Sequence, residues 1–596
     1  SAPVGHHPDL QPSLERRRLE HGATRSIVNR FLDAEVPTGE LLRDPVEEAR
    51  SQPLGRHPQI PLPGELYAGE TSPWPNARGI DLADPLDVAN LLDTLVGAAA
   101  KPWQSAPIVG GEWLEGKQRE IRNPAASDTV VGKVVEADDA AIEQALQRAT
   151  AAQASWDAAG AERRAACLAR TADLMERQCG ELMGLIVAEA GRTIDDALSE
   201  VREAVDFCRY YGSQGRAAFS HPHPLPGPTG ESNELSLHGR GVFLCISPWN
   251  FPLAIFTGQV AAALMAGNSV IAKPAEQTPL IAARAVSLML EAGIPGDIIQ
   301  LLPGDGGQVG GALVNDERVK GVAFTGSTAT AKLINRQLAQ RKGPIVPLIA
   351  ETGGLNAMLV DATALPEQVV DDVITSAFLS AGQRCSSLRV LYLQEDIADT
   401  VIAMLQGAMR ELAIGDPAAL ATDIGPVIDK DARSMLERHA ARMREEARLL
   451  ACCELEARHS CGHFFAPQVY EIQRLAQLPG EVFGPILHII RYTISELPQV
   501  LDDINASGYG LTLGVHSRID GFARDVFNAT RVGNTYVNRN IVGAVVGVNP
   551  FGGQGLSGTG PKAGGPHYLL RFATEKTRTE NVTAKGGNTQ LFNLQE

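Results

Sequence analysis

The chain has 596 residues and a mass of 63.4 kDa, and 44% of its residues are hydrophobic and 21% charged. Such a chain can bury a large core, and a prior of about 150 residues per domain predicts three or more units. Lys and Arg number 53 against 70 Asp and Glu, giving a net charge of −17. This charge disfavours nucleic acid and anionic membranes as partners.

The sequence also bears on the compartment. The N-terminus lacks a charged segment followed by an apolar one, and no apolar run reaches the roughly 18 residues that span a bilayer. The eight cysteines are sparse and lack the paired CxxC spacing of a zinc site, so no metal is expected. Reduced thiols fit a reducing compartment, and we expect a cytoplasmic protein.

The predicted elements change in type along the chain. Residues 1–100 are rich in Pro and charge, which predicts an arm or linker because a full domain core is missing. From about 120 to 215, Ala-rich stretches show helical periodicity. From 241 onward, short apolar runs such as GVFLCIS, SVIAKP and GVAFTGS alternate with helical patterns. Strands separated by helices predict an α/β protein with parallel βαβ units and a doubly wound sheet.

Seven short motifs follow one another from residue 247 onward. They are SPWNFPL (247–253), KPAEQTP (273–279), FTGST (324–328), ETGG (351–354), GQRCSS (382–387), EVFGP (481–485) and PFGG (550–553). With these motifs in this order, residues 105–575 resemble an NAD(P)-dependent aldehyde dehydrogenase. The resemblance implies the aldehyde dehydrogenase fold: a Rossmann-like NAD-binding domain, an α/β catalytic domain and a β-flap for oligomerisation.

The resemblance also implies a division of the chain. The expected parts are an N-terminal arm over 1–100, an NAD-binding domain over 101–220 and 240–350, a catalytic domain over 351–574, and an oligomerisation flap over 221–239 and 575–596. Residues 220–239 are rich in Pro, Gly and polar side chains. They resemble the start of the family's flap, which pairs with a C-terminal strand and covers a neighbouring subunit. We therefore expect a homodimer.

Cys385 lies in GQRCSS between a basic residue and two serines. Oxidation of an aldehyde by hydride transfer requires a tetrahedral adduct, and a thiolate forms such an adduct well. We predict Cys385 as the nucleophile, with the charge of Arg384 lowering its pKa. The alternative is a buried, inert cysteine. We expect that inert state for the cysteines inside apolar helices and strands: Cys167, Cys179, Cys208 and Cys245.

Two further residues would complete the catalytic group. The adduct carries an oxyanion, which needs donors where its charge develops. Asn250, in a turn with two prolines, resembles the family's side-chain donor, and the Cys385 N–H would be the second. Glu351, followed by two glycines, resembles the base that activates water against the thioester, which favours hydrolysis over transfer to coenzyme A. The alternatives are a plain turn residue at Asn250 and a surface carboxylate at Glu351.

The resemblance implies NAD as the cofactor. Lys273 and Glu276 resemble the pair that binds the adenosine ribose, and a carboxylate there favours NAD over NADP because it repels a 2′-phosphate. An ordinary solvated pair is the alternative. Glu481 resembles the residue that holds the nicotinamide ribose, with Phe483 beside it, and Ser327 would meet the pyrophosphate at a helix start. The expected cofactor-binding residues are Ile246, Ser247, Pro248, Trp249, Lys273, Glu276, Gly326, Ser327, Glu481 and Phe483.

Residues 553–558 match GxGxxG, but no good strand precedes them and no helix follows. They are either a pyrophosphate cradle or, as we favour, a glycine-rich loop that shapes a pocket. ETGGLNAMLVDATALPEQ and NPFGGQGLSGTGPKAGGPHYLLRF narrow the resemblance to L-glutamate-γ-semialdehyde (1-pyrroline-5-carboxylate) dehydrogenases. The carboxylate of such a substrate requires hydroxyl and N–H donors. The expected substrate-binding residues are Arg384, Ser386, Gly555, Ser557 and Gly558.

The N-terminal segment LERRRLEHGATRSIVNRFL adds to this resemblance. Arg16 and Arg17 resemble an arginine pair that binds proline in the proline dehydrogenase barrel of bifunctional proline utilization A proteins. No barrel sequence precedes them, so we expect the aldehyde dehydrogenase half of a bacterial bifunctional protein, without FAD or proline dehydrogenase activity. Two alternatives stay open, a dehydrogenase for another small semialdehyde and a non-catalytic scaffold.

Overall fold

The computed structural model describes residues 37, 44, 46, 50 and 74–581. The chain divides into two compact units, 1–75 and 76–596, and the fold below is that of the second unit. Arg16 and Arg17 lie outside the described residues. The division falls before residue 100 because helix α5 (Pro85–Ala99) buries its apolar face against α8 (Cys179–Ala190).

Strands precede the long helices. β4 (Gln118–Asn123) and β5 (Ala126–Val135) form a sheet with β1 (Trp103–Ser105). The prediction of helices from about residue 120 was therefore wrong up to Val135, where β-branched residues favour a strand. From Asp139 the prediction is confirmed by α6 (Asp139–Ala158), α7 (Ala161–Arg177), α8 and α9 (Ile194–Phe219).

A seven-stranded sheet forms the first half of this unit, in the order β12-β11-β8-β9-β10-β2-β3. The strands are β2 (Ile108–Val109), β3 (Glu112–Trp113), β8 (Val242–Ile246), β9 (Ser269–Lys273), β10 (Ile299–Leu301), β11 (Val319–Thr325) and β12 (Leu348–Glu351). The helices that connect them are α10 (Ala254–Met265), α11 (Pro279–Glu291), α12 (Gly311–Asn315) and α13 (Thr328–Gln340).

Strands β8 to β12 are parallel. From β8 the chain adds β9 and β10 on one side and then β11 and β12 on the other, so the winding reverses between β8 and β11. In open α/β sheets, ligands bind outside the carboxyl ends of strands at such a reversal. The predicted doubly wound arrangement is confirmed for this half.

A second seven-stranded sheet has the order β15-β16-β17-β14-β13-β19-β20, and all neighbours except β15 and β16 are parallel. The strands are β13 (Ala357–Val360), β14 (Val390–Gln394), β15 (Arg448–Cys452), β16 (Gln468–Glu471), β17 (Ile486–Tyr492), β19 (Thr512–His516) and β20 (Asn534–Val537). The helices are α14 (Pro366–Phe378), α15 (Glu395–Arg410), α16 (Lys430–Glu446), α17 (Leu497–Ala506) and α18 (Asp520–Ala529). The strand pattern of the sequence thus belongs to two sheets, each with its own buried core.

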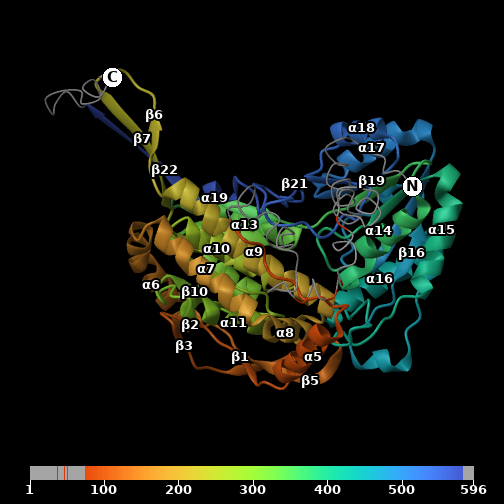
Figure 1. Cartoon of the computed structure of the whole chain (residues 1–596), viewed down its shortest axis with the longest axis horizontal. Coiled ribbons are helices and arrows are strands. Elements are labelled where there is room, and N and C mark those ends of the chain that lie inside the picture. The colour runs from red at the N-terminus through yellow and green to blue at the C-terminus, as the bar shows by residue number, and fades with distance from the viewer. Residues whose placement is uncertain (1–36, 38–43, 45, 47–49, 51–73, 582–596) are drawn as a thin grey trace. The chain divides into compact units, whose positions relative to one another are not determined.

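A three-stranded antiparallel sheet projects from the first half (Figure 1). It consists of β6 (His223–Leu225), β7 (Glu231–Gly239) and β22 (Ala573–Asn581). β22 pairs with β7 along its whole length, from Ala573 opposite Gly239 to Asn581 opposite Glu231. The predicted pairing of residues 220–239 with the C-terminal segment is confirmed up to Asn581, and residues 582–596 lie outside the described part.

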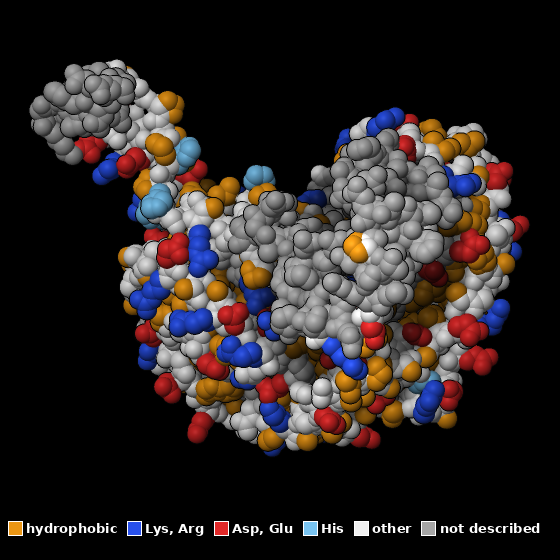
Figure 2. Space-filling model, in the orientation of Figure 1, with side chains coloured by type: hydrophobic (Ala, Val, Ile, Leu, Met, Phe, Trp, Pro, Cys, Tyr) orange, Lys and Arg blue, Asp and Glu red, His pale blue; other side chains and the backbone are white. Residues whose placement is uncertain are grey.

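The surface carries both signs of charge. On the face shown in Figure 2, Lys and Arg side chains are interspersed with Asp and Glu. None of the helices in the described part of the chain has the length and apolar character needed to cross a bilayer.

Candidate active site

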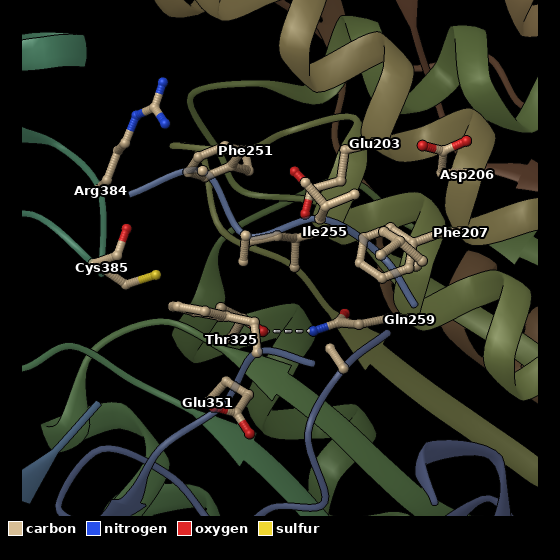
Figure 3. A pocket seen from close by; sticks show the side chains of 18 of the residues that line it. Glu203, Asp206, Phe207, Phe251, Ile255, Gln259, Thr325, Glu351, Arg384 and Cys385 are labelled. Carbon is tan, nitrogen blue, oxygen red and sulfur yellow. Dashed lines mark hydrogen bonds between the residues drawn. The ribbon is translucent and has the colours of Figure 1, made fainter. Parts of the chain in front are cut away.

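A cavity of about 200 Å³ lies between α9, α10 and the loops that follow β12 and α14. Four of the predicted site residues line it: Glu351, Arg384, Cys385 and Ser386. Figure 3 shows the sulfur of Cys385 turned toward the cavity and the guanidinium of Arg384 directed away from it. The structure therefore brings the predicted nucleophile and the predicted base into one space.

The loop between α14 and β14 positions Cys385. Ser380, Ala381 and Gly382 are consecutive left-handed residues, with φ of 54°, 52° and 65°. Only glycine fits at 382, where a Cβ would lie 2.3 Å from the carbonyl oxygen of Gly484. The turn ends α14 and delivers Cys385 to the cavity wall.

The expected effect of Arg384 on Cys385 was wrong. Burial raises the pKa of the Cys385 thiol to about 12, and the carboxylates of Glu481 and Glu351 add to the rise. Arg384 pairs instead with the buried carboxylate of Asp196. Cys385 therefore rests as a thiol, and its activation requires a proton acceptor in the cavity.

Asn250 is buried in the turn after β8 and touches the cysteine loop. Its Nδ2 donates to the carbonyl oxygen of Gln383 at 3.0 Å, two residues before Cys385. The backbone carbonyl oxygen of Asn250 accepts a hydrogen bond from Arg192 Nη1. The amide has two N–H groups, so one of them is left for a further acceptor.

Glu351 ends strand β12 and is held by the glycine-rich loop. Its Oε2 accepts from the Gly553 N–H at 3.1 Å, while Oε1 is buried without a hydrogen-bond partner among the described residues. Burial raises the pKa of Glu351 to about 8, an increase that the Gly553 N–H and Lys562 only partly offset. A carboxyl with one free oxygen and a pKa near neutrality can exchange protons at physiological pH.

Several predicted cofactor residues lie at the carboxyl ends of the parallel strands. Ile246, Ser247, Pro248 and Trp249 follow β8, Lys273 ends β9, and Gly326 and Ser327 follow β11. These ends flank the winding reversal between β8 and β11.

The polar groups at this edge have few partners within the chain. Lys273 is 3% exposed, its Nζ donates to the Pro274 carbonyl at 3.1 Å, and burial lowers its pKa. Glu276 Oε1 accepts from the Gly306 N–H at 2.6 Å. Ser327 caps α13, its Oγ accepting from the Thr330 N–H at 3.1 Å.

Glu481 and Phe483 come from the other half of the molecule. Glu481 Oε1 accepts from Arg389 at 3.1 Å, and Oε2 packs so closely on Gly353 that a Cβ there would lie 1.6 Å from it. The ring of Phe483 contacts Trp249 edge-on, with centroids 5.6 Å apart. The structure therefore joins the EVFGP motif to ETGG and SPWNFPL.

The glycine-rich loop packs against the end of β12 at Glu351. Gly555 belongs to β21 (Gln554–Gly555), which pairs with β18 (Tyr509–Gly510), and Gly558 bridges to Glu351. Ser557 is fully buried, and its Oγ accepts from the Gly510 N–H at 3.0 Å. Among the described residues that line the cavity, none is Gly555, Ser557 or Gly558. The loop contacts the base, Gly555 and Gly558 line a second cavity, and the contact of the loop with the substrate stays a prediction.

Sequence reasoning missed much of the cavity wall. The missed residues include Glu203, Asp206 and Phe207 of α9, Phe251, Gln259 of α10, and the loop Gly543–Val546. Gln259 Nε2 donates to Thr325 Oγ1 at 2.9 Å (Figure 3). The acidic residues at 203 and 206 lie on a helix with several other charged residues, so they gave only a weak signal, and the loop at 543–546 gave none.

Arg389 was missed as well. Its side chain is 1% exposed and donates to the carbonyls of Gly382, Gly484 and Arg384. It therefore ties the cysteine loop to the Glu481 loop. A charged residue at the start of the apolar run RVLYL was its only signal.

The chain is similar to known proteins in both sequence and structure. The model of the aldehyde dehydrogenase family matches residues 113–578. The chain belongs to the aldehyde dehydrogenase family. The 1-pyrroline-5-carboxylate dehydrogenase of Geobacillus kaustophilus is 35% identical over 479 residues, which are 79% of this chain and 92% of that protein. A crystal structure of 1-pyrroline-5-carboxylate dehydrogenase from Thermus with bound NAD has a TM-score of 0.81 and 32% identity, covering 86% of this chain and all of that one.

A longer relative within the family matches even more of the chain. The bifunctional protein PutA of Klebsiella aerogenes is 51% identical over 589 residues, which are 96% of this chain but 44% of that protein. The chain thus spans about half the length of the bifunctional relatives it matches.

Proposed function

We propose that this aldehyde dehydrogenase oxidises L-glutamate-γ-semialdehyde, which forms from 1-pyrroline-5-carboxylate, to L-glutamate with NAD as the hydride acceptor. The observation that carries the proposal is the cavity shared by Cys385 and Glu351, with Asn250 at the cysteine loop. The substrate is that of the relative matched over nearly its whole length.

The site fits NAD. A dinucleotide lies at the carboxyl ends of parallel strands where the winding reverses, and here that position carries Lys273, Glu276 and Ser327. The amine of Lys273 is buried and, among the described residues, donates to one carbonyl, which leaves donors for ribose hydroxyls. Glu481, held by Arg389 beside the cysteine loop, would hold the nicotinamide ribose. NAD, when bound, supplies the hydride acceptor.

The chain's own residues perform the steps at carbon. Cys385 loses its proton, with the nearby carboxylate of Glu351 as the acceptor, and its sulfur bonds to the aldehyde carbon. The second amide N–H of Asn250 and the Cys385 N–H stabilise the oxyanion, an interaction worth about 3 to 4 kcal/mol per donor. Loss of the hydride leaves a thioester on Cys385. Glu351 first releases the Cys385 proton to solvent and then takes a proton from water, the water oxygen attacks the thioester carbon, and the C–S bond breaks to leave the Cys385 thiolate.

The head group of the substrate requires hydrogen-bond donors in the cavity. Ser386 is next to the nucleophile, and Gly543 and Ala544 line the same cavity. We assign the α-carboxylate to the Ser386 hydroxyl and the N–H groups of Gly543 and Ala544, in place of the Gly555–Gly558 loop. Arg384, which is paired with Asp196, contributes to the wall but has no free charge to offer.

The proposed homodimer, compartment and bifunctional protein are each supported by a separate observation. Strands β7 and β22 leave most of their side chains partly or fully exposed, which supports a homodimer in which a second copy covers them. All eight cysteines lie in the described part and are unpaired, which supports a cytoplasmic protein. The relation to PutA supports a place in a bacterial bifunctional protein that also carries proline dehydrogenase.

Relative specificity tests the proposed substrate. We expect kcat/KM for glutamate semialdehyde to exceed those for succinate semialdehyde and propanal at least about 100-fold, because unpaired polar groups penalise analogues without the head group. Ser386→Ala should reduce this preference and leave propanal oxidation nearly unchanged. Equal kcat/KM values for the three aldehydes would contradict the assignment.

A further inference from the structure

Three charged residues form a buried row on the first turns of α9. Arg192 precedes the helix, and Asp196 and Glu200 follow at intervals of four, so all three share one face. Their side chains are 5%, 0% and 0% exposed. Arg192 Nη2 lies 3.7 Å from Asp196 Oδ1, and Arg192 Nε lies 3.2 Å from Glu200 Oε2.

One end of this row holds the loop of Asn250. Arg192 Nη1 donates to the carbonyl oxygen of Asn250. Glu200 Oε1 accepts from the N–H groups of Leu253 and Ala254, at 2.7 and 3.3 Å. Leu253 is the N-cap residue of α10 and has no capping side chain, so Glu200 takes over that role from another helix.

The other end holds the loop of Cys385. The Asp196 carboxylate accepts from Ser380 Oγ and from Arg384 Nη2, and Arg384 Nε donates to the same Ser380 Oγ at 3.0 Å. Ser380 and Ala381 are the two left-handed residues of this loop that are not glycine. Such a conformation is unfavourable for a residue with a Cβ and persists only where its surroundings fix it.

The two ends also meet at one aromatic ring. The guanidinium of Arg192 lies 4.4 Å from the ring centroid of Phe251, and that of Arg384 lies 5.6 Å from it. Phe251 lines the cavity and follows Asn250 in sequence (Figure 3). The ring is thus held between both arginines, and the two loops are fixed relative to each other through it.

Stability alone does not account for this row. Buried ion pairs are often no more stable than apolar side chains of similar size, because desolvation offsets the attraction. Charged groups do form directional hydrogen bonds. Here each group bonds to a particular backbone or side-chain atom of a catalytic loop.

We propose that Asp196, with Arg192 and Glu200, is a positioning residue that aligns Asn250 with Cys385, so that the two donors to the oxyanion converge on one point. This inference rests on the proposed roles of Asn250 and Cys385, not on the identity of the aldehyde. Asp196 is fully buried and is not among the described residues that line the cavity, so it would act through Ser380 and Arg384.

A double-mutant cycle tests the alignment. The variants are Asp196→Asn, Asn250→Ala and both together, and kcat is normalised to the thiol that iodoacetamide titrates at Cys385. Asp196→Asn should lower kcat about 100-fold with KM nearly unchanged, the effect of a displacement of about 1 Å. In the Asn250→Ala background the same change should cost less than about threefold, because the donor that it misaligns is already gone. An equal loss in both backgrounds would overturn the proposal.

Milder variants keep the test independent of folding. Asp196→Asn leaves the buried charge of Arg384 unpaired, so Ser380→Ala, which keeps every charge paired, is measured in the same cycle. It should show a smaller loss that also vanishes with Asn250→Ala. Asp195→Asn, an exposed neighbour in the same helical turn, is the matched control and should leave kcat unchanged. A control as slow as Asp196→Asn would contradict the proposal.

The cycle is read with two substrates. 4-Nitrophenyl acetate passes through a tetrahedral adduct on a cysteine and needs no NAD. If the wild type hydrolyses this ester but does not oxidise glutamate semialdehyde, the proposed function fails and the cycle still decides the alignment. If coupling between Asp196 and Asn250 is absent with both substrates, the alignment fails and the proposed function stands.

Discussion

At the scale of single residues, Glu351 is the residue that we propose activates water to hydrolyse the thioester. Its buried Oε1 has no partner in the described part of the chain, and burial raises its pKa to about 8. Glu351→Gln keeps the shape and removes the base. Because Glu351 also accepts the Cys385 proton in the proposed mechanism, we expect a slowed first phase of about one equivalent of NADH per active site, followed by steady turnover at least about 100-fold slower than wild type. Stopped-flow absorbance measures both phases, and unchanged steady turnover would exclude Glu351 as the base.

The same raised pKa makes a prediction about stability. The folded chain holds the Glu351 proton more tightly than the unfolded chain, where the ordinary pKa is 4.5. This carboxyl therefore stabilises the fold fully below about pH 4.5, and the contribution is lost as the pH rises through about 8. Gln stays neutral, so Tm of Glu351→Gln relative to wild type should increase between about pH 5 and pH 9. The other buried carboxyls cancel in this difference, and a constant difference would contradict the shift.

The limits of sequence reasoning are clearest at Arg384. Cys385, Glu351 and Asn250 could be found because each lies in a motif of fixed order. Whether an adjacent charge acts on the cysteine depends on its partner, and the partner of Arg384 is 188 positions away at Asp196. No local pattern contains that pairing.

At the scale of elements, the loop after β12 is packed against the Glu481 loop. A Cβ on Gly353 would lie 1.6 Å from Glu481 Oε2. Gly353→Ala should displace Glu481 and raise KM for NAD about tenfold or more, while ester hydrolysis, which needs no NAD, falls much less. Gly97→Ala in α5 is the control, because a Cβ there meets nothing within 4 Å. Unchanged KM for NAD in Gly353→Ala would separate Glu481 from cofactor binding.

The strands that could be predicted are those buried on both faces. β8, β9 and β11 are continuous apolar runs because helices cover both sides of their sheet. β4 and β5 lie largely exposed next to Ala-rich helices, and their pattern was overlooked. The division into two sheets was also out of reach, since short apolar runs do not show which strands pair.

At the scale of the whole molecule, the sheet of β6, β7 and β22 is an extension with little core of its own. Its strands leave most side chains partly or fully exposed, which a single copy of the chain does not explain. We expect light scattering to give twice the 63.4 kDa mass of one chain. A single species at the mass of one chain would contradict the dimer.

We propose that the chain oxidises glutamate semialdehyde with NAD through an adduct and a thioester on Cys385. The most direct measurement is NADH formation at about 340 nm from 1-pyrroline-5-carboxylate, which equilibrates with the semialdehyde, in wild type and Cys385→Ala. We predict NAD-dependent turnover in the wild type and none above background in the variant. A wild type that is silent with this substrate, or a variant that still turns over, would contradict the account.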